Sequence, residues 1–71
     1  MDAKIEQMLK NQSVVKAAED EATRLMLALY QAREDGDAAS VATLKPQVKA
    51  ARQAHEAALD ASLRWMRENG M

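Results

Sequence analysis

The sequence contains no cysteine and no phenylalanine, and it has only two glycines and one proline among its 71 residues. Without cysteine the chain can form neither a disulfide nor a thiolate metal site. Much of its apolar content is alanine and methionine, and a chain of this length buries only a modest fraction of its surface. We therefore expect one marginally stable domain, residues 1–71, that gains further burial from a second protein chain.

No charge of one sign dominates, because ten basic and eleven acidic residues leave a net charge of −1. A balanced surface lacks the field that drives non-specific binding to nucleic acids or anionic membranes. No apolar run approaches the roughly eighteen residues of a membrane span. The N-terminus also lacks the basic start followed by an apolar run that a signal peptide shows, so we expect no signal peptide. We expect a cytoplasmic protein with no membrane partner, and the charge balance argues against nucleic acid as a partner.

The one cluster of turn-forming residues is Glu34-Asp35-Gly36-Asp37, which has about thirty residues of helix-forming sequence on either side. Gly36 can adopt the left-handed conformation that ends a helix, and Asp37 can cap the next one. Asp2 can likewise cap the first helix. The sequence predicts a helix over about 3–35, a turn at 36–37 and a second helix over about 38–69, stopped by Gly70.

An inner row of small and apolar residues recurs at alternating spacings of three and four, as in an antiparallel helix pair. Folding the chain about Gly36 pairs positions whose numbers sum to about 73, so that Leu29 meets Leu44 and polar Asn11 meets polar Ser62. The same pairing places Glu19 and Arg52 within reach on one flank. The row comprises Met8, Asn11, Val15, Ala18, Ala22, Leu25, Leu29, Ala32, Val41, Leu44, Val48, Ala51, His55, Ala58, Ser62 and Trp65. The predicted fold is an all-α, antiparallel two-helix hairpin of coiled-coil type.

Pro46 complicates the second helix, because proline removes a helical hydrogen bond and bends the rod when it lies in the interior. If Thr43 were the true N-cap, Pro46 would fall in the first turn, where its missing N–H costs nothing. Both alternatives remain open, and we expect a bend or a short separate turn over about 38–45, with a break near Pro46. Ser13 offers a comparable restart in the first helix.

A second apolar stripe runs beside the inner row on both helices. A two-helix unit has no third layer to cover it, and exposed apolar surface of this kind usually marks an interface. We expect it to bury against a second copy, giving a homodimeric four-helix bundle, or against another protein. With Trp65, whose neighbouring methionine and arginines suit an interface centre, the predicted interface residues are Ile5, Leu9, Met26, Tyr30, Leu59, Leu63, Trp65 and Met66.

No catalytic, metal-binding or cofactor-binding motif is present. His55 lies in the inner row and is interpreted as a packed side chain rather than as a ligand or base. Glu19-Asp20-Glu21 point around a helix and indicate solvated charge. Without a nucleophile motif, metal-ligand spacing or phosphate-cradling glycine loop, we expect no enzyme activity, no cofactor and no small-molecule ligand.

In overall layout the chain resembles two kinds of small helical hairpin, namely plasmid RNA-modulating proteins that dimerise into four helices and co-chaperones of type III secretion needle subunits. The resemblance covers the architecture and carries no residue roles. The sequence predicts a protein-binding module, such as an adaptor, a co-chaperone or an inhibitor of a host regulator. A structural subunit of a larger assembly is one alternative. An RNA-binding bundle is the other, favoured if Lys4, Lys10, Arg64 and Arg67 formed one continuous face across a dimer.

Overall fold

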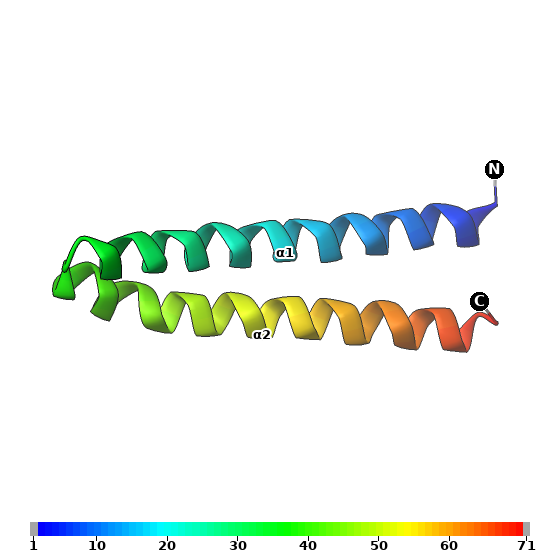
Figure 1. Cartoon of the computed structure of the whole chain (residues 1–71). Coiled ribbons are helices and arrows are strands. Elements are labelled where there is room, and N and C mark those ends of the chain that lie inside the picture. Colours follow the sequence, from blue (N-terminus) through cyan, green and yellow to red (C-terminus); the bar gives the residue numbers. More distant parts are fainter. Residues whose placement is uncertain (1, 71) are drawn as a thin grey trace.

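The computed structural model describes residues 2–70, which form two antiparallel helices joined by a tight turn (Figure 1). Helix α1 spans Ala3–Glu34 and helix α2 spans Ala38–Glu68. The Cα atoms extend over 51 × 19 × 12 Å, so the hairpin is a flat rod. The turn lies at one end of the rod, and the start of α1 and the end of α2 lie at the other end (Figure 1). The predicted all-α, antiparallel hairpin is confirmed.

The turn closes α1 and opens α2 through the same aspartate. Gly36 has φ 67°, and its N–H donates to the carbonyl of Arg33 at 3.2 Å, while the Asp37 N–H donates to the carbonyl of Ala32 at 2.9 Å. These two bonds form the Schellman motif, which satisfies carbonyls at a helix C-terminus. The Asp37 carboxylate then accepts from the backbone N–H of Ser40 at 3.1 Å. The predicted cap is therefore confirmed, as is Asp2, which accepts from the N–H of Lys4 at 2.9 Å.

Every member of the predicted inner row is buried or half-buried. The buried apolar members lie mainly toward the turn, where Leu25, Leu29 and Val48 form the core cluster. Toward the termini Met8, Asn11 and their neighbours are only half-buried, and the two ribbons spread apart in this view (Figure 1). Packing is therefore tightest in the half of the rod next to the turn.

The break predicted near Pro46 is wrong, because α2 continues without interruption from Ala38 to Glu68 with Pro46 inside it. Thr43 is not an N-cap either, since its hydroxyl donates to the carbonyl of Ala39 at 3.1 Å within the helix. Pro46 is exposed on the outside of the rod, so its ring does not pack in the core. Ala42, whose carbonyl Pro46 leaves without a helical donor, is exposed as well, so this carbonyl can be hydrated. The alternative helix start at Ser13 is absent as well.

Candidate interaction surface

Several large apolar side chains remain exposed, with between 38% and 66% of their surface accessible. Single exposed apolar residues are ordinary on proteins, so their arrangement carries the information. Among residues 2–70 they are Ile5, Leu9, Val14, Met26, Leu27, Tyr30, Leu59 and Leu63.

Most of these side chains lie on one broad face of the rod. Leu9, Leu59 and Leu63, for example, each directly follow a member of the inner row, and one residue rotates a helix by about 100°. In an antiparallel pair, the sides that follow the inner row on the two helices adjoin each other. We call this the apolar face and define it by Ile5, Leu9, Met26, Tyr30, Leu59, Leu63 and the half-buried Met66.

A hollow of about 290 Å³ lies between the helices on the terminal half of this face. Val15 and Ser62 of the inner row lie beside Leu59, Leu63 and Met66 in its wall. Because residues of both helices line one hollow, the two stripes do share a face. We call Ile5, Leu9, Leu59, Leu63 and Met66 the terminal patch.

A charged belt of Lys16, Glu19, Arg52 and Glu56 crosses the middle of the apolar face. Lys16 Nζ lies 3.0 Å from Asp20 Oδ1, and the hydrogen bond to this carboxylate raises the pKa of Lys16. Both ion pairs among residues 2–70 lie within α1, so the expected pairing of Glu19 with Arg52 across the hairpin is not formed. Glu19, Arg52 and Glu56 therefore present charges on this face that no ion pair within the hairpin engages.

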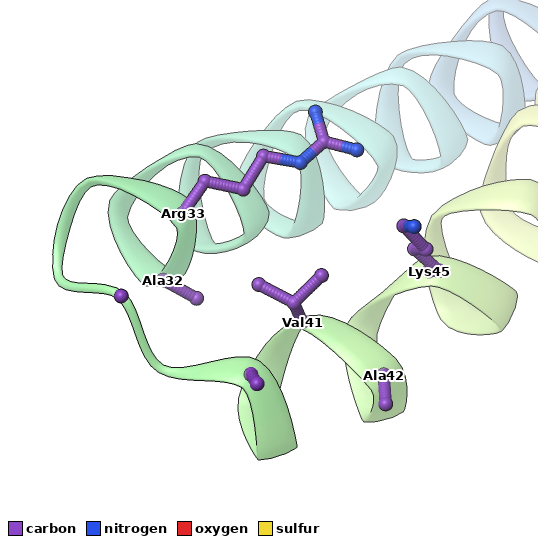
Figure 2. Close-up of a pocket in the computed structure, with 7 residues that line it drawn as sticks. Ala32, Arg33, Val41, Ala42 and Lys45 are labelled. Atoms are coloured by element: carbon purple, nitrogen blue, oxygen red, sulfur yellow. The ribbon is translucent and has the colours of Figure 1, made fainter.

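A second hollow, of about 420 Å³, lies at the turn end (Figure 2). Ala32, Val41 and Ala42 are among the residues that line it, together with Arg33 of α1 and Lys45 of α2. Met26 and Tyr30 lie on the same face nearby, by their spacing along α1. The turn end of the apolar face is thus less apolar than the terminal end and carries positive charge.

Trp65 is not on the apolar face. It belongs to the inner row, where it is half-buried, and its carbonyl accepts from the side-chain amide of Asn69 at 2.8 Å. Two exposed apolar residues, Val14 and Leu27, were not predicted as interface residues. Val14 precedes the inner-row residue Val15 and so lies on the opposite broad face, whereas Leu27 lies on the outside of α1. The helical period of the sequence already places both side chains off the apolar face.

The basic residues at the terminal end lie on more than one side of the rod. Lys4 Nζ donates to the backbone carbonyl of Asn69 at 3.4 Å. Lys10 and Arg64 each precede an inner-row residue, so the helical period places them on the broad face opposite the terminal patch. Arg67 lines the same small hollow as Arg64. The RNA-binding alternative depends on one continuous basic face across a dimer, which a single hairpin does not test.

Over residues 2–70, no group of three or more histidine, cysteine or acidic side chains is arranged to hold a metal ion. Within the same residues, neither helix is long and apolar enough to cross a membrane. Comparison with protein-family models, with curated proteins and with solved structures found no match to this chain.

Proposed function

We propose that the protein is a non-catalytic interaction module, which binds and modulates a protein partner by packing its apolar face against helices. The observation that carries this proposal is the terminal patch, in which Leu59, Leu63 and Met66 of α2 line one hollow between the helices. Ile5 and Leu9 of α1 are exposed on the same face. Contiguous apolar surface rimmed by polar residues is typical of protein-binding sites. A helical adaptor, co-chaperone or inhibitor would use it in the same way.

The composition of the patch suits helix packing. Leucine, isoleucine and methionine present flexible aliphatic surface, and methionine adapts to differently shaped partners. Ridges of side chains on two facing helices leave grooves that a partner helix can fill, as in helix-in-groove recognition. The charged belt next to the terminal patch would fix the register of such a helix rather than add much affinity.

The test compares two double variants that carry the same chemical change on different faces. In L9E/L63E both substitutions fall in the terminal patch, at side chains that are 50% and 54% exposed. In V14E/L27E they fall off the apolar face, at side chains that are 60% and 66% exposed. Because all four sites are exposed, both variants should keep the helical circular dichroism of the hairpin.

Affinity capture from the native host, followed by quantitative mass spectrometry, gives the readout. We expect L9E/L63E to lose the proteins that the wild-type chain retains, and V14E/L27E to keep them. If both variants retained the same proteins as wild type, the terminal patch would not be the binding surface. Any protein lost with L9E/L63E alone would then be purified and titrated against each variant.

A further inference from the structure

We propose that a second copy of this chain covers the apolar face, with both turns at the same end of the rod. Helix α1 of each copy then lies along α2 of the other, giving a four-helix bundle in which all neighbouring helices are antiparallel. This inference rests on the proposed function, because it assigns the occupant of the same surface. Its basis is the order of apolar and charged residues along the face.

Two identical rods can pack face to face about a two-fold axis in only two ways, with the turns together or at opposite ends. Residues of α1 and α2 whose numbers sum to about 73 lie at the same height along the rod, as the core cluster of Leu25, Leu29 and Val48 with Leu44 shows. The height of each residue on the face therefore determines what it meets in each arrangement.

With the turns at the same end, the apolar residues of the two terminal patches meet each other, while Met26 and Tyr30 lie at the height of Lys49 and Lys45. Ile5 lies at the height of Met66, and Leu9 lies at the height of Leu63. In this arrangement Ile5 and Leu9 of one copy therefore face Met66 and Leu63 of the other copy. The terminal patch thus covers itself, which is the self-complementarity that a two-fold interface requires. Ile5, Leu9 and Leu63 are between 43% and 54% exposed in the single hairpin, so they have surface left to bury.

The belt is complementary in the same arrangement. Lys16 meets Glu56 of the second copy, and Glu19 meets Arg52 of the second copy, and the two-fold axis repeats both pairs. Glu19 and Arg52 point toward the centre of the bundle, so each carboxylate lies among two guanidinium groups. Such a charged layer sets register and orientation more than it adds stability.

With the turns at opposite ends, Arg52 would still face Glu56 of the second copy, but Glu19 and the terminal patch would lose their match. Leu59 and Leu63 would face Lys49 and Lys45 of the second copy, and Glu19 would face its own symmetry mate. Like charges directly opposite each other are destabilising, and the terminal patch would lie against the more polar turn end. The residue pattern therefore favours the arrangement with the turns together.

The size of the face is sufficient. A rod with Cα extents of 51 × 19 Å offers room for the roughly 800 Å² per partner of a standard interface. The cations Arg33 and Lys45 of both copies come near each other at the turn end, and their long side chains can turn outward to water. The tightest contact is then expected in the terminal half.

The orientation is tested with one nitroxide label per chain, on E34C, which is the only thiol because the chain has no cysteine. Glu34 is exposed near the turn and caps no helix. With the turns together, electron-spin dipolar spectroscopy should give a label separation within about 30 Å, the width of two helix layers plus the label arms. Opposite ends would give roughly 45 Å or more along the rod, because about thirty residues at 1.5 Å each separate the sites.

Charge reversal tests the belt without touching the apolar patch. The variant K16E places two carboxylates against each other at two symmetric sites, and we expect the dimer dissociation constant to rise on the order of tenfold. The double variant K16E/E56K restores opposite charges and should return the constant close to wild type. In the opposite-end arrangement Lys16 faces neutral Thr23, so K16E would leave the constant unchanged.

These outcomes separate the inference from the proposed function. A separation near 45 Å, a signal without a defined distance, or an unchanged constant in K16E would overturn the same-end dimer. Capture of a host protein that depends on Leu9 and Leu63 would still support an interaction module in that case. Loss of the dimer in L9E/L63E with no change in captured proteins would support the dimer and overturn the wider function.

Discussion

Replacing Pro46 by alanine should make the hairpin more stable. Pro46 lies inside α2, where proline disfavours the helix by about 3 kcal/mol relative to alanine. Alanine restores a backbone N–H that can donate to the carbonyl of Ala42. The ring is exposed and packs against nothing in the core, so removing it leaves no cavity.

Two effects reduce the gain. The carbonyl of Ala42 belongs to an exposed residue, so water can hydrate it when Pro46 is present. Proline also restricts the unfolded chain, and losing that restriction costs about 0.4–1 kcal/mol. We therefore expect P46A to raise the free energy of unfolding by about 2 kcal/mol, equivalent to roughly 10 °C in melting temperature for a chain of this size.

The assay is thermal unfolding followed by circular dichroism, at one fixed protein concentration because the melting temperature of a self-associating protein depends on concentration. Q53A is the matched control, since Gln53 lies two turns further along the same outer surface of α2 and is also exposed. Its melting temperature should differ from wild type by no more than a few degrees. An unchanged or lower melting temperature in P46A would refute the interpretation that Pro46 is a tolerated but costly residue within a continuous helix.

Three further predictions concern the core and the turn. L29A should lower the free energy of unfolding, measured with urea, by about 2–3 kcal/mol because Leu29 is only 8% exposed. L27A, at a side chain that is 66% exposed, is the control and should change this free energy by less than about 0.5 kcal/mol. G36A should cost about 1–2 kcal/mol by the same measurement, since an added Cβ meets no atom within 4 Å and the φ of 67° alone is unfavourable for alanine; a wild-type stability would contradict the left-handed turn. The hydroxyl and backbone N–H of Ser40 lower the pKa of Asp37, so the cap stabilises the fold above the unfolded-state pKa of about 3.9 and this contribution disappears as the pH falls through the lower folded value. The difference in melting temperature between wild type and D37A should accordingly shrink between about pH 5 and pH 2, and a constant difference would contradict the role of the ionised cap.

The sequence was sufficient to predict the hairpin because several local signals agree. The spacing of Leu25, Leu29 and Val48 indicates which sides of the helices face each other, and Gly36 with Asp37 indicates where the chain reverses. These signals act over one or two helical turns, so a single sequence contains them. The structure confirms both the inner row and the caps.

Pro46 was misjudged for a physical reason. A rule about proline in a helix interior gives the cost of the lost hydrogen bond, but the rest of the hairpin determines whether that cost interrupts the helix. Here Val41 and Leu44 pack on the core cluster before the proline and Val48 is buried after it, so both sides are held in one helix. The uneven burial along the rod was also not predicted, because it depends on how closely the helices approach.

The composition of the apolar face was readable from the sequence, but its occupant was not. The spacing of Leu9, Leu59 and Leu63 shows that a face exists and that one hairpin leaves it uncovered. Which molecule covers it depends on surfaces outside a single chain. The order of Lys16, Glu19, Arg52 and Glu56 across the belt gained meaning only when the two helices were seen side by side.

The most direct measurement is the mass of the wild-type chain in solution, by sedimentation equilibrium over a range of protein concentrations, with L9E/L63E alongside. About half of each leucine side chain remains to be buried, so the four leucines of a dimer would contribute about 3–6 kcal/mol, or two to four orders of magnitude in dissociation constant. We predict twice the 7.8 kDa chain mass for wild type and 7.8 kDa for L9E/L63E. A wild-type chain that stayed at 7.8 kDa up to high concentration would contradict the proposal that its apolar face is covered by a second copy.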